Sequence, residues 1–250
     1  MTQNLISKEE AQVRIDLAAA LRWTARLDLH EAVANHYSVV IEGEEKPEIL
    51  LNPKLKHFSR VKASDIVKFD LDATDVLSRP DAPDISAWYL HSHLHKQLPQ
   101  AKVIFHTHMP NTLALACMKD FEFMMLDQNA TRFYNRIAYD RDYNGLAMDD
   151  QEGERCAKLL GDGKTVLFMG NHGVMLVGET VADVFDEMYY LEKAADTQVK
   201  VLASGRTPAI IPDDVAKMAC EQWHEYPGFS DYHFNELKAI LDDEGAAFRE

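Results

Sequence analysis

The spacing of three histidines is the feature of this sequence best suited to chemistry. His106 and His108 are separated by one residue and follow an apolar run. On an extended chain, residues two apart point to the same face, so both imidazoles can reach one ion at about 2.0–2.1 Å. His172 lies in the segment 170–173, which carries two glycines between two other apolar runs. This pattern predicts a tight turn that presents the histidine at the end of a hairpin.

Three imidazoles presented in this way would form a metal centre. Three protein nitrogens leave positions open for substrate or water, as catalytic metal sites require. We therefore predict that His106, His108 and His172 hold one divalent metal ion. For the first two alone, exposed or individually hydrogen-bonded side chains are the simpler interpretation, and His172 is what favours the metal.

The other histidines give weaker patterns. His91 and His95 lie four apart on a predicted helix and share a face, which suits acid/base groups or a solvated face. We favour the solvated face for His95 and for His93. The remaining histidines carry no pattern, and we expect no role in the site for them: His30, His36, His57, His224 and His233.

Charge and composition argue against several classes of protein. The 250 residues include 41 acidic and 26 Lys or Arg side chains, a formal charge of −15. Such a surface repels phosphate backbones and anionic lipids, so we expect neither nucleic acid nor membrane as a partner. No apolar run reaches the roughly 20 residues of a membrane span. The first ten residues lack a basic and an apolar region, and the three cysteines form no close pair, so we expect reduced thiols in a cytoplasmic protein.

Alternating strands and helices must position these histidines. The patterns predict helices at about 8–27, 84–94, 150–160 and 180–205, and one that begins at Pro110. Strands are predicted at 36–41, 48–52, 67–71, 102–106, 165–169 and 174–177. The stretch 127–143 is predicted to be irregular with a short strand. Residues 1–205 would form the metal-binding domain, and 206–250 a helical tail that packs on the same domain or on a neighbouring subunit.

Four segments together resemble the class II aldolase/adducin family, over about residues 7–205. They are residues 33–38, 51–53, 105–108 and 171–173. The resemblance implies a three-layer α/β/α domain with a largely antiparallel sheet, in a homotetramer with active sites between subunits. It also implies zinc held by His106, His108 and His172, which polarises substrate oxygens while a carbon–carbon bond breaks or forms. Iron and manganese are alternative metals.

The sequence departs from the sugar-phosphate aldolases of that family in two places. Ala87 stands where those enzymes have an acid/base glutamate, so the chain resembles members that lack it. Lys54 and Leu55 replace the Ser/Thr-Gly pair of the phosphate cradle, which favours a substrate without phosphate. His91, one turn after Ala87, is the candidate catalytic acid/base.

These comparisons leave three functions open. The first is a metal-dependent lyase that cleaves or decarboxylates a small metal-chelating hydroxy or oxo acid. In that enzyme Asn35, Ser86 and Arg132 are the candidate substrate contacts, although Arg132 suits a subunit contact equally well. The second is a non-haem iron oxygenase with the same three histidines. The third is a non-catalytic, adducin-like interaction protein.

Overall fold

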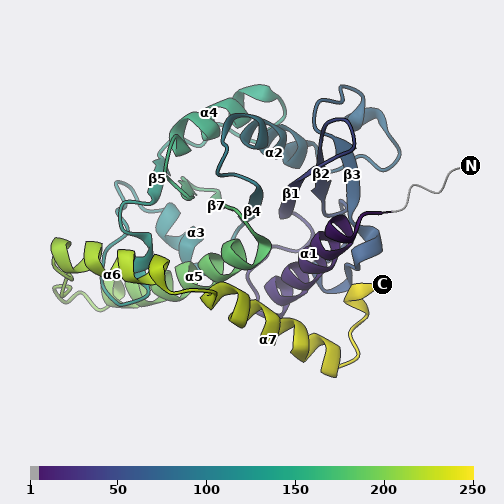
Figure 1. The fold of residues 1–250 in the computed structure, drawn as a ribbon. Helices are drawn as coiled ribbons and strands as arrows, with labels where there is room; N and C mark the ends of the chain where they lie inside the picture. The colour runs from purple at the N-terminus through teal and green to yellow at the C-terminus, as the bar shows by residue number, and fades with distance from the viewer. Residues whose placement is uncertain (1–5) are drawn as a thin grey trace, which may run out of the picture.

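A seven-stranded sheet runs through the middle of the protein and carries helices on both faces (Figure 1). The computed structural model describes residues 6–250. The strand order is β3-β2-β1-β4-β7-β6-β5, and every neighbouring pair is antiparallel except β5 and β6. The predicted α/β/α fold with a largely antiparallel sheet is therefore confirmed.

The observed elements follow the predicted ones closely. The strands are β1 (His36–Glu42), β2 (Pro47–Leu51), β3 (Val67–Asp70), β4 (Val103–Thr107), β5 (Ile137–Asp140), β6 (Val166–Met169) and β7 (Gly173–Gly178). The helices are α1 (Lys8–Arg26), α2 (Ile85–Gln97), α3 (Pro110–Ala116), α4 (Asp150–Leu160), α5 (Val181–Ala203), α6 (Asp213–Glu225) and α7 (Phe229–Asp243).

Side-chain caps explain where the long helices begin. The Ser7 side chain accepts from the Glu10 N–H at the start of α1, and Thr180 accepts from the Asp183 N–H at the start of α5. At the start of α4 the Asp149 side chain accepts from the N–H two residues on, so Asp150 is the first helical residue.

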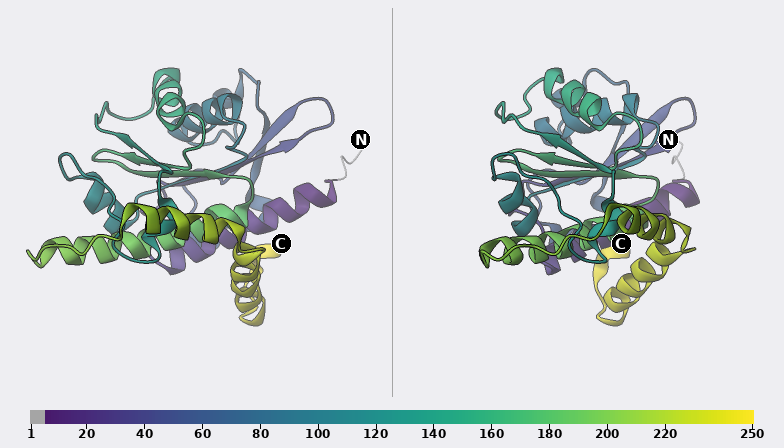
Figure 2. Two further views of the ribbon diagram at one scale, coloured as in Figure 1. Left: turned by 60° about the vertical axis from the view of Figure 1, so that its left-hand side comes forward. Right: turned by 90° about the vertical axis from the view of Figure 1, so that its left-hand side faces the viewer.

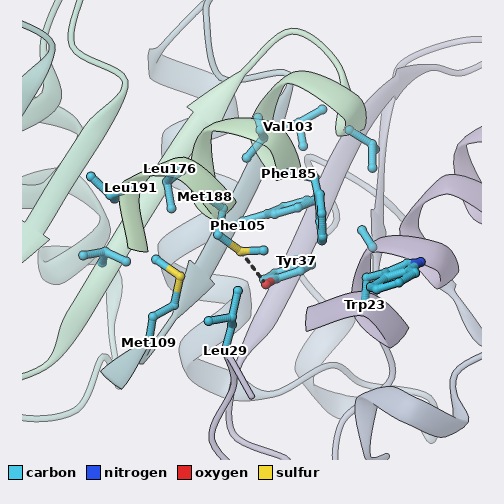
Figure 3. Close-up of a cluster of buried hydrophobic side chains, with 14 of the residues drawn as sticks. Trp23, Leu29, Tyr37, Val103, Phe105, Met109, Leu176, Phe185, Met188 and Leu191 are labelled. Carbon is cyan, nitrogen blue, oxygen red and sulfur yellow. Dashed lines mark hydrogen bonds between the residues drawn. The ribbon is translucent and has the colours of Figure 1, made fainter. Parts of the chain in front are cut away.

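Successive side chains of β1 and β4 point alternately to the two faces of the sheet. Tyr37 and Phe105 stack at 3.7 Å between ring centres, and the Tyr37 hydroxyl donates to Met188 of α5 (Figure 3). Their neighbours His36 and His106, which are register partners, therefore point to the opposite face, toward α2. Figure 2 shows α2 and α4 on that face, with α1 and α5 on the other.

The tail packs on the same chain. Phe234 and Leu241 of α7, with Phe248 beyond it, belong to the main hydrophobic core beside α1 and α5. The Trp23 indole N–H donates to the Leu237 carbonyl. Gly205 has a φ of 66°, the left-handed conformation expected just beyond the end of α5.

The structure bears on the expectations for membrane-spanning segments and for the cysteines. Among residues 6–250, none of the helices has both the length and the apolar character needed to cross a membrane. The expectation for the first residues of the chain falls largely on residues 1–5, outside the described part. Cys117, Cys156 and Cys220 are free thiols.

Candidate metal centre

The structure brings the three predicted ligands together at the ends of interior strands of the sheet. His106 is near the end of β4, His108 follows that strand, and His172 lies in the turn between β6 and β7. One ring nitrogen of each lies within 4.8 Å of the others. Because β4 pairs with β7, the end of one strand and the start of the other present these side chains side by side.

The hydrogen bonds of His106 and His108 leave one nitrogen of each ring free for a metal. Nδ1 of His106 lies 3.1 Å from the Val174 carbonyl oxygen, and Nδ1 of His108 lies 2.5 Å from a Glu31 carboxylate oxygen. Both oxygens are acceptors, so each Nδ1 carries the proton and each Nε2 presents a lone pair.

Those two Nε2 atoms lie 3.1 Å apart. Two lone pairs at that distance repel, and a cation bound by both removes the repulsion. Burial lowers the pKa of His172 to about 4 and holds the pKa of His106 well below its usual range. These two rings are therefore neutral at pH 7, which is the form that binds metal ions. The donor set fits a divalent metal.

After the turn that carries His172, the backbone at Gly173 passes very close to Thr107 and His108. A Cβ on Gly173 would lie 2.7 Å from Cδ2 of His108 and 2.7 Å from the Thr107 carbonyl oxygen. Only glycine lets β7 begin this close to the ligands. The sharp bend itself does not use the glycines as the sequence suggested, because Asn171 is the residue with a left-handed φ, at 55°.

His91 is not free to act directly on a substrate. The side chain is fully buried, with Nε2 2.7 Å from Nδ1 of His36 and Nδ1 2.5 Å from the Ser38 hydroxyl. Both ring nitrogens are thus engaged within the protein. An acid/base role for His91 stays a prediction, and it would require one of these two hydrogen bonds to open.

His36 was expected to have no role in the site and His95 to lie on a solvated helix face, but both rings make contacts inside the protein. His36 is 4% exposed and its ring centre lies 4.7 Å from that of His106. Nε2 of His95 lies 2.7 Å from the same Ser38 hydroxyl that bonds His91. A signal for this was present in the sequence. His36 and Ser38 share a strand face, as His91 and His95 share a helix face.

Two of the predicted substrate contacts border the centre. The Asn35 side-chain oxygen accepts from the Glu31 N–H at 2.7 Å, while its buried Nδ2 has no hydrogen-bond partner among the residues that the structure describes. The Ser86 hydroxyl donates to Asp84 at 2.6 Å and lies 3.4 Å from Nε2 of His36. The free Nδ2 donor of Asn35 therefore lies close to Glu31, the residue that hydrogen-bonds His108. No pattern in the sequence had pointed to Glu31.

Arg132 does not belong to this centre. It is 8% exposed, forms an ion pair with Asp186 of α5, and stacks over Tyr190 and Trp223 at 4.3 and 4.8 Å. These contacts join the loop before β5 to α5 and α6 within one chain. Within one chain Arg132 therefore lies in a buried cluster with α5 and α6, and a contact with substrate or with a neighbouring subunit stays a prediction.

Known proteins with similar sequences or structures show the family of the chain. A model of the family described as the class II aldolase and adducin N-terminal domain matches residues 15–199. A putative aldolase class 2 protein of Caulobacter vibrioides is 31% identical, over 85% of this chain and 81% of its own. The crystal structure of an aldolase II superfamily protein from Pseudomonas syringae has a TM-score of 0.88 at 28% identity, covering 99% of each chain.

Two Streptomyces proteins are more distant relatives with named activities. Decarboxylase NovR of Streptomyces niveus is 26% identical over 88% of this chain and 83% of its own. The 4-hydroxy-3-prenylphenylpyruvate oxygenase/4-hydroxy-3-prenylbenzoate synthase of Streptomyces roseochromogenus is 26% identical over 88% of this chain and 81% of its own. The matched segment contains all three clustered histidines, and the chain belongs to the class II aldolase/adducin family.

Proposed function

We propose that this protein is a metal-dependent carbon–carbon lyase that acts on a small, metal-chelating hydroxy or oxo acid without phosphate. The observation that carries the proposal is the three-histidine cluster, in which the rings of His106 and His108 each turn an Nε2 lone pair toward the other. The membership in a family of class II aldolases and the similarity to a decarboxylase support the same kind of chemistry.

In this proposal the chain itself binds and orients the substrate. His106, His108 and His172 would hold zinc, which when bound polarises carbonyl and carboxylate oxygens. Asn35 offers its unpartnered Nδ2 as a donor to a substrate oxygen. Ser86 lies next to His36, and its hydroxyl is held by Asp84.

Two observations disfavour the chemistry of a sugar-phosphate aldolase. Ala87, in the place of the family glutamate, is buried and can transfer no proton. Leu55 has the left-handed φ of 60° that a cradle glycine would adopt, and its side chain is 74% exposed at that point. A bulky side chain at this position closes a backbone approach that a phosphate group would use.

The metal content of the purified protein tests the proposal. We expect near-stoichiometric zinc in the wild type and its loss in His172→Ala, with His93→Ala as the control because His93 lies on α2 outside the cluster. Full metal retention in His172→Ala would overturn the ligand assignment. Carbon–carbon cleavage is then sought with a panel of hydroxy and oxo acids.

An iron-dependent oxygenase is the second candidate function, favoured by the similarity to the Streptomyces oxygenase. It predicts iron in the purified protein and oxygen consumption that depends on ferrous iron. A zinc-containing protein that consumes no oxygen with the same acids would reject it. A protein that binds no metal and turns over no acid would instead be an adducin-like interaction module.

We also propose a cytoplasmic homotetramer with active sites between subunits. The loop after β5 supports a subunit contact at the centre. Tyr143, 6.1 Å from the His172 ring, is 51% exposed, and the neighbouring Leu146 and Met148 are 73% and 55% exposed. Light scattering of the eluting protein gives the subunit number, and a monomer of 28.4 kDa would contradict the assembly.

A further inference from the structure

A continuous chain of hydrogen bonds lies behind the metal centre, between α2 and strand β1. Nδ1 of His95 lies 2.6 Å from the Ala101 carbonyl oxygen, and Nε2 of His95 lies 2.7 Å from the Ser38 hydroxyl. From Ser38 the chain passes to Nδ1 of His91 at 2.5 Å. From Nε2 of His91 it passes to Nδ1 of His36 at 2.7 Å.

The carbonyl at one end determines the direction of every bond. A carbonyl only accepts, so Nδ1 of His95 donates and Nε2 of His95 is an acceptor. The Ser38 hydroxyl therefore donates to His95 and accepts from Nδ1 of His91. Nε2 of His91 must then accept from Nδ1 of His36. Each ring carries its proton on Nδ1, and the chain ends in a lone pair on Nε2 of His36.

This direction holds only if the rings are neutral. Burial lowers the pKa of His95 to about 4 and holds the pKa of His91 well below its usual range. A proton added at His95 would reverse the chain and place an N–H on Nε2 of His36, where the only acceptor that the structure offers among residues 6–250 is the Ser86 hydroxyl oxygen at 3.4 Å.

Within the described part of the chain, residues 6–250, the lone pair at the end meets no strong donor. Nε2 of His36 lies 3.4 Å from the Ser86 hydroxyl, whose hydrogen goes to Asp84 at the much shorter distance of 2.6 Å. The His36 ring faces that of His106, its register partner on β4. The free acceptor thus lies beside a ligand of the metal centre.

We propose that the Ala101 carbonyl fixes the tautomer of His36 through His95, Ser38 and His91, so that Nε2 of His36 accepts the hydroxyl group of a hydroxy acid bound at the three-histidine centre. His36 is the substrate-contacting and specificity-determining residue, and His91, Ser38 and His95 are positioning residues. The substrate contact rests on the proposed function, whereas the tautomers do not.

Nitrogen NMR of the zinc-saturated protein, labelled with ¹⁵N-histidine, tests the chain directly. In the wild type we expect a protonated Nδ1 and an unprotonated Nε2 for His36, His91 and His95. A proton on Nε2 of His36 would overturn the proposal, and this measurement needs no variant.

Breaking the chain away from His36 gives a second test. In Ser38→Ala, Nδ1 of His91 loses its acceptor, so we expect its proton to move to Nε2 and donate to His36. The proton of His36 then appears on its Nε2. Ser92→Ala is the matched control, because Ser92 is a buried serine of α2 outside the chain. An unchanged His36 spectrum in Ser38→Ala would contradict the relay.

Two small acids test the substrate contact. Glycolate and methoxyacetate both offer a carboxylate and a neighbouring oxygen, but only glycolate has a hydroxyl hydrogen. By calorimetry on zinc-saturated protein we expect glycolate to bind roughly tenfold more tightly, as one hydrogen bond to a buried acceptor would give. His36→Phe should remove this preference, and Ser92→Ala should keep it.

The possible outcomes separate the two proposals. Equal binding of the two acids by the wild type, or a preference that survives in His36→Phe, would overturn the acceptor role of His36 alone. If the protein holds zinc but neither acid binds, the proposed function fails together with that role. The NMR result decides the tautomer chain in either case.

Discussion

A Glu31 carboxylate oxygen lies 2.5 Å from Nδ1 of His108, across a sequence separation of 77 residues. The carboxylate fixes the orientation of the ring and makes its Nε2 a better electron donor. Glu31 therefore supports the metal centre from a loop that contributes no ligand itself.

Glu31→Gln should weaken metal binding without removing a ligand. An amide cannot supply the negative charge that raises the basicity of the imidazole, so we expect zinc affinity to fall about 10- to 100-fold. Competition with a chelator of known affinity measures this. Glu44→Gln, an exposed change in another loop, should bind zinc as the wild type does. Equal affinities in both variants would mean that the contact does not tune the centre.

Gly173→Ala should disturb the centre through packing. The new Cβ would lie 2.7 Å from Cδ2 of His108 and from the Thr107 carbonyl oxygen, and the latter belongs to rigid backbone. We expect a loss of about 1–3 kcal/mol in the free energy of unfolding, together with weaker zinc binding. Gly178→Ala, at the other end of β7, meets only the Val184 side chain. It should keep the zinc affinity, and parallel behaviour of the two variants would contradict a local effect.

Arg132→Met should reduce stability and leave the metal centre intact. The substitution leaves the buried carboxylate of Asp186 with the His233 ring, 2.7 Å away, as a remaining side-chain partner. Removing one member of a buried ion pair costs about 3–5 kcal/mol, which urea unfolding would detect. Zinc and glycolate binding at a temperature well below the unfolding transition should match the wild type. Selective loss of glycolate binding would return Arg132 to the substrate site.

The ion pairs of Glu10 should make stability depend on pH in the acid range. Burial raises the pKa of this carboxyl, but hydrogen bonds and charges from Arg14 and Lys68 outweigh it, and the folded-state pKa is lowered below 4.5. Because the folded state then binds the proton less well than the unfolded chain, this stabilisation is complete above about pH 4.5 and is lost as the pH falls through the lowered pKa.

Urea unfolding of the wild type and Glu10→Gln between pH 3 and 7 measures this effect. The difference between their free energies of unfolding should be largest near neutral pH and shrink below pH 4.5. Glu9→Gln, next to it on the exposed side of α1, should show no such pH-dependent difference. A constant difference across the range would exclude the ion pairs as its cause.

Local patterns determined the elements and the ligands. Helix starts such as Thr180 depend on side-chain hydrogen bonds within three residues, and strand faces depend on alternation, so both are written in short stretches of sequence. The pair His106 and His108 shares a strand face for the same reason. His172 could be predicted as the third ligand because a turn between two apolar strands presents its side chains at the ends of those strands.

Only the tertiary structure decided how distant side chains meet. His36 and His91 are 55 residues apart, and the pairing of β1 with β4 together with the packing of α2 brings them to 2.7 Å. The charge of Arg132 would suit a substrate site as well as a buried ion pair, so the sequence could not distinguish them. The structure shows the ion pair, because Asp186 of α5 lies next to Arg132. Periodicity specifies the face that a residue occupies, but it does not specify the element that packs there. Register and packing between elements therefore decided which side chains His36, His91 and Arg132 contact.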